Sequence, residues 1–324
     1  MEYLTSRRIR TRLSIALALL WCATLAGFAG GWWWPMDLLS SFHPHYAAAF
    51  LAGALLMLAT RRWLLVAAAL GGFVLNAAVL AGPFSAAQAS HRELAANARP
   101  LRVVTLNVWF RNHDYDRVAR YLEATQADVV ILQEVDAAQA LEIGARLDEY
   151  PYRFVEAARV RHGAAILSRH PLGATQAVRL TPEGVTVARA RLEVRGQPVT
   201  VIGAHLHWPV GPRDSRLRND ELAALGRLAA DVEGPLVIAG DLNITPFSPW
   251  FAKFLGESGL ADCSGGAALP GSWPAWFGPA AIRIDHCLMS AHFAPLGSRR
   301  GTRVGSDHAP LVNDLALAVR LARH

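Results

Sequence analysis

Several apolar, valine-rich segments of this chain are followed directly by a carboxylate, an amide or an imidazole, the side chains that acid–base and metal chemistry require. The segment VVTL precedes an asparagine, VVILQ precedes a glutamate and LVIAG precedes an aspartate. The residues of this kind are Asn107, Glu134, His205, Asp241, Asn243 and Asp285. Burying such groups without partners costs several kcal/mol, so we expect these residues to interact with one another in a common functional site.

Short apolar runs of this kind are typical of buried strands, and the ends of neighbouring strands meet at one rim of a sheet. Carboxylates gathered at such a rim would repel one another unless a cation lay among them. Oxygen ligands from Asp, Glu and Asn suit Mg²⁺, with Mn²⁺ also possible, better than they suit zinc. The pattern therefore predicts a divalent-metal site at the rim of a sheet.

The elements that must position these side chains begin at Leu101, where short β-branched runs alternate with amphipathic stretches. Buried strands are predicted over 101–107, 128–133, 163–168, 185–194, 199–205, 236–241, 282–290 and 309–319. Helices are predicted over 114–124, 137–147, 214–232 and 248–256. This order indicates an α/β or α+β scaffold of about 225 residues, which is within the size range of a single domain.

Seven short motifs follow one another along this scaffold: LNVW (106–109), QEV (133–135), GAAILSR (163–169), AHLH (204–207), GDLN (240–243), IDHCLMS (284–290) and SDHAPL (306–311). As an ordered set they resemble the endonuclease/exonuclease/phosphatase superfamily over residues 101–319. That superfamily includes pancreatic deoxyribonuclease, abasic-site endonucleases, inositol-polyphosphate 5-phosphatases and neutral sphingomyelinases. The resemblance implies an α/β fold of two packed β-sheets flanked by helices, a four-layer sandwich with its site at one edge.

By this resemblance Glu134 is the main metal-ligand carboxylate, and Asn107 and Asp307 are supporting ligands. A cation held in this way would neutralise phosphate charge and stabilise the transition state of hydrolysis. The implied protein is a divalent-metal-dependent phosphoric ester hydrolase of the phosphodiesterase or nuclease type, in which water attacks phosphorus.

The resemblance implies roles for five further residues. Asp241 is placed to orient or deprotonate the attacking water, and Asn243 could donate to the scissile phosphate or to Asp241. His308 with Asp285 resembles a His–Asp pair in which the carboxylate fixes the tautomer and favours the charged imidazole. His205 matches a phosphate-binding or leaving-group position. Asp241 and His308 are joint candidates for the base.

Other residues near these motifs have simpler interpretations. His207 faces away from His205 on an extended segment and is either a second phosphate contact or a solvated side chain. Arg218, in the predicted helix before GDLN, is expected to be a surface charge. The aromatic residues between 273 and 277 are expected to be a structural loop cover; the alternative is an apolar wall beside the substrate.

Residues 1–82 are predicted to form a membrane anchor of about three transmembrane helices. The run 13–30 has no charge, and the run 63–82 has Asn76 as its only strongly polar residue. Twenty helical residues span roughly 30 Å, the thickness of the hydrocarbon core. A middle span is predicted over 42–60, although its apolar part is shorter. A signal peptide in place of the first span and a buried pair of core helices are the alternatives.

The arginines around these runs predict the orientation of the anchor. Four arginines precede the first run, and Arg61 and Arg62 lie between the second and third, whereas residues 31–45 and 83–91 carry neither Lys nor Arg. The protein is therefore expected to be a multi-pass protein of the inner (cell) membrane. Residues 83–100 would be a linker, and the catalytic domain 101–324 would lie on the non-cytoplasmic side. If the middle span does not insert, the catalytic domain would instead lie in the cytoplasm.

Composition limits the classes of partner. The chain is 52% hydrophobic and 18% charged, which excludes disorder and argues against a purely soluble protein. Of the net charge of +6, residues 1–100 contribute +5 (eight Arg, three acidic residues), which leaves about +1 for 101–324 and no broad basic face for nucleic acid. The substrate classes considered are nucleic acid, a phospholipid, as for a sphingomyelinase-like lipid phosphodiesterase, and a small phosphate ester. A non-catalytic, membrane-tethered binding module is the alternative, and no protein partner is inferable.

The three cysteines exclude a disulfide-rich scaffold and a cysteine-rich zinc module. Cys22 lies in an apolar run. Cys263 and Cys287 could pair if the domain lies outside the cytoplasm, and the sequence does not decide this.

Overall fold

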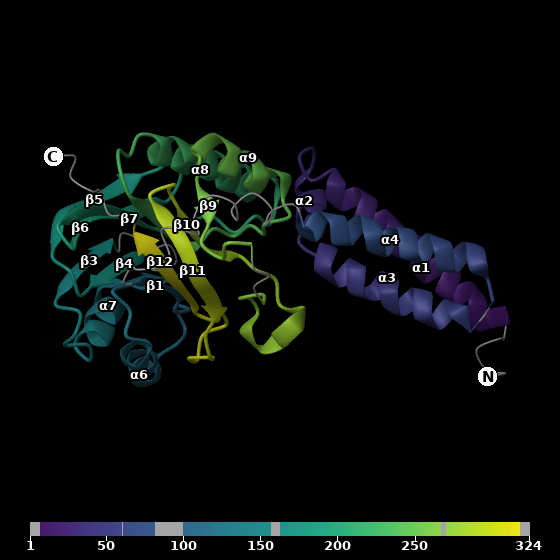
Figure 1. The fold of residues 1–324 in the computed structure, drawn as a ribbon, viewed down its shortest axis with the longest axis horizontal. Coiled ribbons are helices and arrows are strands. Elements are labelled where there is room, and N and C mark those ends of the chain that lie inside the picture. Colours follow the sequence, from purple (N-terminus) through teal and green to yellow (C-terminus); the bar gives the residue numbers. More distant parts are fainter. Residues whose placement is uncertain (1–6, 60, 82–99, 157–162, 267–269, 318–324) are drawn as a thin grey trace. The chain divides into compact units, whose positions relative to one another are not determined.

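The computed structural model describes residues 7–59, 61–81, 100–156, 163–266 and 270–317 (Figure 1). The chain divides into two compact units, Met1–Ser85 with Thr245–Ala252, and Ala86–Ile244 with Lys253–His324. The predicted linker 83–100, apart from Pro100, lies outside the described residues.

The first unit is helical. Its helices are α1 (Arg7–Phe28), α2 (Trp34–Ser40), α3 (His43–Leu58) and α4 (Trp63–Ala81). α3 packs against α4 and α1 around a core that includes Phe50, Ala54 and Ala69. Asn76, the polar residue of α4, is buried and satisfied, because its side chain hydrogen-bonds to His43 and Thr24.

Two stretches of helix in this unit, Thr11–Phe28 and Trp63–Ala81, are long and apolar enough to cross a membrane. α3 has 16 residues, and a helix of that size is about 24 Å long, less than the ~30 Å of a hydrocarbon core. The predicted middle span 42–60 and the three-helix transmembrane bundle are therefore not confirmed.

The second unit contains two six-stranded sheets. The first has the order β11-β12-β1-β2-β4-β3, and the second has the order β5-β6-β7-β8-β10-β9. The strands of the first sheet are β1 (Leu101–Asn107), β2 (Val129–Gln133), β3 (Tyr152–Glu156), β4 (Ala164–Ser168), β11 (Phe293–Arg300) and β12 (Leu311–Leu317). Those of the second are β5 (Leu172–Arg179), β6 (Thr186–Val194), β7 (Gln197–His205), β8 (Leu236–Asp241), β9 (Ala261–Asp262) and β10 (Asp285–Met289).

The main core lies between the two sheets. Small and β-branched side chains fill it, with Val103 and Ile131 contributed by one sheet and Val201 and Ala239 by the other. Gly203 of β7 faces Ile131, where an added Cβ would come within 2.8 Å of that side chain, so the glycine allows the sheets to approach closely. Both faces of the central strands are buried, which explains their continuous apolar runs.

Helices flank the sheets, which confirms the predicted α/β fold of two packed sheets. α6 (Tyr115–Thr125) and α7 (Ala137–Gly144) pack on the outer face of the first sheet. α8 (Pro212–Ala230) lies on the side of the second sheet (Figure 1). α9 (Pro249–Ser258) crosses the division between the two units, and the short helix η3 (Ala275–Ala280) precedes β10.

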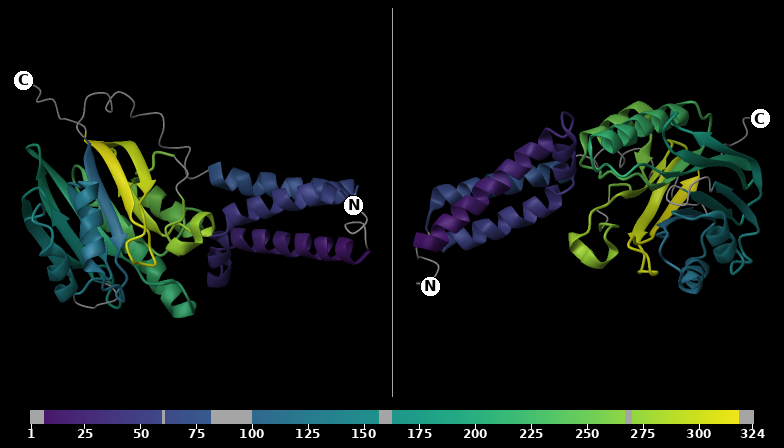
Figure 2. Two further views of the ribbon diagram at one scale, coloured as in Figure 1. Left: turned by 90° about the horizontal axis from the view of Figure 1, so that it is seen from below. Right: turned by 180° about the vertical axis from the view of Figure 1, so that it is seen from behind.

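The C-terminal strands complete the first sheet beside its first strand. β12 pairs antiparallel with β1, and Figure 2 shows the two C-terminal strands (yellow) next to β1 (blue). Residues 301–310 connect β11 to β12 and belong to no strand. This connection contains the predicted site residues Asp307 and His308.

All eight predicted strands are present, with ends that differ by at most three residues. The four strands that the sequence did not predict are the edge strands of the two sheets, β11, β3, β5 and β9. Edge strands bury less of their surface, and β5 is mostly exposed, so they lack the apolar run that marks a central strand.

Candidate active site

Strand register brings the predicted site residues to one rim of the sandwich. β1 and β2 are parallel, and Asn107 lies opposite Gln133. Asn107 therefore lies at the end of β1, next to the end of β2, which Glu134 follows directly. β7 and β8 are parallel with His205 opposite Asp241. β10 runs antiparallel to β8, so Asp285 begins its strand opposite Asp241, whereas the sequence pattern placed it at a strand end.

Glu134 sits on a tight turn directly after β2. Its φ of +56° is unusual for a residue with a side chain, and such strain is typical of functional positions. The carboxylate accepts hydrogen bonds from the Asn107 amide at 3.0 Å and from the Phe110 N–H at 3.1 Å. The side chain is 17% exposed, so this carboxylate reaches the solvent side of the rim.

Asn107 links two carboxylates. Its Oδ1 accepts the Trp109 N–H at 2.9 Å, which directs Nδ2 towards Glu134 Oε1 and Asp241 Oδ2, at 3.0 and 3.1 Å. The amide therefore acts here as a donor between the carboxylates. Its predicted role as a metal ligand would use the second lone pair of Oδ1.

Asp241 lies at the centre of the group and is 2% exposed. Its Oδ1 accepts the Asn243 N–H at 2.9 Å, and its Oδ2 lies 3.6 Å from His205 Nε2 and 3.7 Å from His308 Nε2. Burial raises the pKa of Asp241 to about 7, against the opposing attraction of charged His308. Both distances from Asp241 Oδ2 to an imidazole nitrogen are too long for a direct hydrogen bond. The oxygen atom of a water or ligand could therefore hydrogen-bond to the carboxylate and to an imidazole at the same time.

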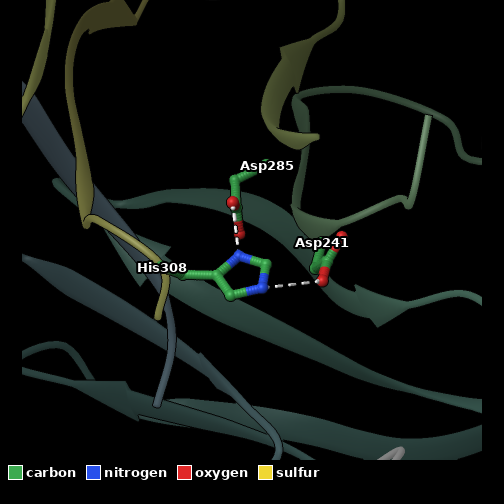
Figure 3. Close-up of side chains that lie close together, drawn as sticks. All are labelled: Asp241, Asp285 and His308. Carbon is green, nitrogen blue, oxygen red and sulfur yellow. Dashed lines mark hydrogen bonds and ion pairs between the residues drawn. The ribbon is translucent and has the colours of Figure 1, made fainter. Parts of the chain in front are cut away.

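Asp285 and His308 form a buried hydrogen-bonded pair beside Asp241 (Figure 3). His308 Nδ1 lies 2.8 Å from Asp285 Oδ2, and its Nε2 points to Asp241. Burial opposes the charged imidazole, but the two carboxylates outweigh it and raise the pKa of His308 to about 10. Burial alone would raise the pKa of Asp285, but charged His308 outweighs it, so the net direction is downward.

His205 differs in its electrostatics from His308. Burial, and then repulsion from charged His308, lowers the pKa of His205 to about 3. Its Nε2 lies 3.6 Å from Asp241 and 4.0 Å from Glu134. A neutral imidazole at this point would bind a phosphate oxygen by donating a hydrogen bond and not by its charge.

Asp307 is half-buried and retains an unused oxygen. Its Oδ2 accepts the Trp273 indole N–H at 3.2 Å, and its Oδ1 is buried without a hydrogen-bond partner. Burial raises the pKa of Asp307, and repulsion from Glu134 acts in the same direction. A buried carboxylate oxygen without a hydrogen-bond partner fits a hard divalent cation such as Mg²⁺.

Among the described residues, the ligand atoms of Asp241, Asp285 and His308 lie within 4.8 Å of one another and could also hold an ion. We favour a metal position at Glu134 and Asp307 over this one, because Asp285 already accepts the hydrogen bond of His308 Nδ1. Glu134 and Asp307 also offer the more exposed carboxylates, which a hydrated Mg²⁺ requires.

Asn243 contributes mainly through its backbone. Its side-chain Nδ2 donates to the Leu206 carbonyl at 2.9 Å, and its carbonyl accepts Nη1 of Arg218 at 2.8 Å. The contact with Asp241 comes from its main-chain N–H. The expectation that Arg218 is a surface charge is wrong, because Arg218 is 1% exposed and braces the loop that carries Asn243.

The endonuclease/exonuclease/phosphatase family model matches residues 104–308, the segment that contains every residue of this site. The chain belongs to the Endonuclease/Exonuclease/phosphatase family. Members of this family are typically phosphoester hydrolases, and the buried Asp–Asp–His group is compatible with metal-dependent hydrolysis. No curated protein sequence matches the chain.

Solved structures of the Endonuclease/Exonuclease/phosphatase fold resemble the chain. A family protein from Beutenbergia cavernae is 24% identical with a TM-score of 0.56, over 68% of this chain and 72% of that one. One from Bacteroides vulgatus is 18% identical with a TM-score of 0.57, over 68% and 99%. D. rerio TDP2, solved with a single-strand DNA product, is 17% identical with a TM-score of 0.58, over 67% and 98%. Because these sequence identities are low, the structural similarity shows only that the fold is shared.

Sequence reasoning missed three supports of this Endonuclease/Exonuclease/phosphatase site. The hydroxyl of Ser306 donates to the Asn107 carbonyl at 2.7 Å and accepts the His308 N–H at 2.9 Å, which ties the last loop to β1. Trp273 contacts both Asp307 and the His308 ring, so the expectation of a mere loop cover is incomplete. The motif SDHAPL contains Ser306, but nothing in the spacing of the motif identifies the Asn107 carbonyl as the hydrogen-bond partner of this serine.

The third support is a buried glutamate. Glu221 of α8 is fully buried and accepts the Val185 N–H, the His207 N–H and the His207 ring, the last at 2.5 Å. His207 is therefore partly buried and anchored, so the solvated alternative is wrong. A glutamate in a helix gives no sequence signal of such a partner.

Proposed function

We propose that this protein is a membrane-anchored, divalent-metal-dependent phosphoester hydrolase of the phosphodiesterase type. The observation that carries the proposal is the hydrogen-bonded Asp285–His308 pair facing the buried carboxylate of Asp241. Such a group is able to orient and deprotonate water. Glu134, which is hydrogen-bonded to Asn107, and Asp307, whose Oδ1 has no hydrogen-bond partner, offer further carboxylates to a cation. A catalytically inactive binding module would not need to bury this many ionisable groups together.

Mg²⁺, or alternatively Mn²⁺, is the proposed cofactor. Glu134 and Asp307 would hold it, with Asn107 in support, because Asp307 Oδ1 has no other partner and the oxygen donors are hard. When bound, the ion would neutralise charge on the phosphate and stabilise the transition state.

The chain's own residues would manage the proton and the phosphate oxygens. Asp241 Oδ2 lies 3.7 Å from His308 Nε2, so water lodged between them would contact the carboxylate and the imidazole together. Asp285 holds His308 by Nδ1, which fixes Nε2 towards this point. Asp241 is the proposed base, and charged His308, held by Asp285, would assist by donating a hydrogen bond from Nε2 to the water or to a phosphate oxygen. His205 would donate to a phosphate oxygen or to the leaving oxygen.

The anchor is the second part of the proposal. The two apolar helical stretches, Thr11–Phe28 and Trp63–Ala81, support insertion in a membrane. We retain the boundaries 1–82 for the anchor, 83–100 for the linker and 101–324 for the catalytic domain. Arginine placement supports a multi-pass protein of the inner membrane with its N-terminus inside. The proposed non-cytoplasmic position of the catalytic domain requires the middle span 42–60 to insert as well, because two spans alone would return the chain to the cytoplasmic side.

The substrate is proposed only as a phosphoester. A structural neighbour, TDP2, was solved with a single-strand DNA product, which keeps nucleic acid among the candidates. The near-neutral charge of residues 101–324 gives little electrostatic support for a phosphate backbone.

The test is hydrolysis of bis-p-nitrophenyl phosphate by the full-length protein in detergent, with Mg²⁺ and with excess chelator. We expect turnover with Mg²⁺ that chelator abolishes and that His308→Ala lowers by ~10²-fold or more, the usual weight of a general acid–base group. Absence of turnover in wild type, or equal turnover in the variant, would overturn the proposal.

A further inference from the structure

Exposed aromatic side chains stand within a few residues of the catalytic groups on two separate segments. Trp208 is 62% exposed and lies three residues after His205. Trp276 and Phe277 are 54% and 57% exposed and belong to η3. Large apolar side chains left in water at the mouth of a site usually mark a contact surface.

The segment that carries Trp276 and Phe277 is fastened to the catalytic residues at three points. The Trp273 indole donates to Asp307, and the Ala275 N–H donates to the Asp307 carbonyl at 2.7 Å. The Ser272 hydroxyl accepts the Asp285 N–H at 3.2 Å. These bonds fix the start of η3 to Asp285 and Asp307, and the exposed rings follow within two residues of Ala275.

The two rings are arranged as a unit. Trp276 and Phe277 pack edge to face, with centroids 6.4 Å apart, so neither is hidden by the other. Pairs of this kind offer a large apolar area at a small cost in side-chain entropy. Tryptophan in particular prefers the boundary between water and lipid, where its ring and its N–H are both satisfied.

We propose that Trp208, Trp276 and Phe277 form an aromatic rim that takes the glycerol and upper acyl region of a membrane phospholipid, whose phosphodiester enters the site. This inference rests on the proposed function and names its substrate class. Two observations favour lipid over nucleic acid: residues 101–324 carry a net charge of only about +1, and the same chain has two helical stretches long enough for a bilayer.

The test compares two substrates of the full-length protein. One is bis-p-nitrophenyl phosphate, and the other is a phosphatidylcholine–phosphatidylglycerol mixture in nanodiscs that also hold the protein. We expect Trp276→Ala/Phe277→Ala to lower the ratio of lipid to soluble turnover at least tenfold, and Trp208→Ala to lower it less. Tyr152→Ala, which removes an exposed aromatic from the edge strand β3, should leave both activities unchanged.

The outcomes separate this inference from the proposed function. If wild type cleaves the soluble diester but no phospholipid, the rim inference is wrong and the proposed function stands. If wild type cleaves neither substrate, the proposed function itself fails. An unchanged ratio in the double variant, or a selective loss on a single-stranded oligonucleotide, would also overturn the lipid assignment, the latter in favour of base stacking on the rim.

A second inference rests on a different observation, the cysteine pair. Cys263 follows β9 directly opposite Cys287 of β10: the Cys263 N–H donates to the Cys287 carbonyl at 2.9 Å, and the adjoining Asp262 pairs with Leu288. Their sulfurs are in contact and both residues are fully buried. Directly opposed residues of this kind lie at a Cα separation that a disulfide can bridge.

We infer that Cys263 and Cys287 are a disulfide site that closes the segment carrying Trp273 and η3. The two thiols give up two protons and two electrons to a small or protein disulfide, which leaves as two thiols when the new sulfur–sulfur bond forms. The link would restrain the loop that holds Asp307 and Asp285. It is independent of the substrate and of the metal.

The test counts thiols in the denatured full-length Cys22→Ser protein after incubation in detergent with oxidised glutathione, warmed close to its unfolding temperature. We expect no titratable thiol before reduction and two afterwards, without a glutathione adduct in the mass spectrum. Cys22→Ser/Cys263→Ser serves as control and should form no internal link. Two free thiols, or glutathione adducts on both cysteines, would contradict the inference.

Discussion

At the scale of single residues, the site depends on a buried carboxylate that holds one nitrogen of an imidazole. Asp285 lies 2.8 Å from His308 Nδ1, and the other nitrogen is left for Asp241. The sequence motifs IDHCLMS and SDHAPL contain both partners, so this pair was predictable. The donor role of the Asn107 amide was not, because it follows from the Trp109 N–H, whose direction depends on a turn with positive φ at Trp109.

Asp285→Asn should lower kcat on a soluble phosphodiester by about 10²–10⁴-fold, because the amide keeps the shape but no longer favours the productive, charged imidazole. The measurement is steady-state kinetics together with thermal unfolding. Asp128→Asn is the matched control, since Asp128 also contacts a histidine, His170, at 3.1 Å but lies just before the first residue of β2. Equal activity losses in both variants would argue for a general structural effect.

Trp273→Phe should weaken metal binding more than turnover. The change removes the indole N–H that donates to Asp307 Oδ2 while keeping an aromatic ring. Loss of a hydrogen bond to a metal-ligating carboxylate typically costs about 10- to 100-fold in metal affinity. The Mg²⁺ concentration for half-maximal activity should rise accordingly, with kcat at saturating Mg²⁺ less affected. A fall in kcat with no shift in the Mg²⁺ requirement would rule out this role for Trp273.

At the scale of elements, the central strands were predictable and the edges were not. β2 and β8 are buried throughout, and β1 is buried except at Arg102, so their apolar runs stand out in the sequence. The edge strand β5 is largely exposed, and β3 has no fully buried residue, so both resemble loops in the sequence. The register that gathers the site could not be read from the sequence either, because the antiparallel direction of β10 follows from tertiary packing.

A buried ion pair joins β9 to the segment before β10. Asp262 and Arg283 lie 2.7 Å apart with side chains 7% and 5% exposed. Asp262→Asn should destabilise the domain by about 3–5 kcal/mol at pH 7, because it leaves the guanidinium buried without its partner charge. Urea unfolding measures this. Glu183→Gln, which breaks an exposed pair with Arg213, is the control and should change stability by ~0.5 kcal/mol or less.

The same pair gives a pH dependence. Burial alone would raise the pKa of Asp262, but Arg283 outweighs it, so the pKa lies below its usual value in the folded protein. A depressed carboxyl pKa stabilises the fold above the unfolded value of about 4, and this stabilisation is lost as pH falls further. The difference between wild type and Asp262→Asn should therefore shrink below pH ~4. A constant difference from pH 7 to pH 3 would contradict this origin.

At the scale of the whole molecule, the sequence predicted a catalytic domain with the correct fold and a separate apolar N-terminal region. The family model, which matches residues 104–308, agrees with the motif set. The middle one of the three predicted membrane spans is not confirmed, because the described part of the run 42–60 forms a helix of only 16 residues, His43–Leu58. Composition marks such a run as apolar, but its end at Leu58 is not visible in the residues themselves.

The central claim is that carboxylates far apart in the chain share one divalent ion. Its most direct test is Mn²⁺ binding to the full-length protein, followed by electron paramagnetic resonance, for wild type, Glu134→Gln and Asp307→Asn. The account predicts one Mn²⁺ per chain in wild type, at least tenfold weaker binding in each variant, and displacement by Mg²⁺. Equal Mn²⁺ affinity in all three proteins, or no bound ion in any, would contradict it.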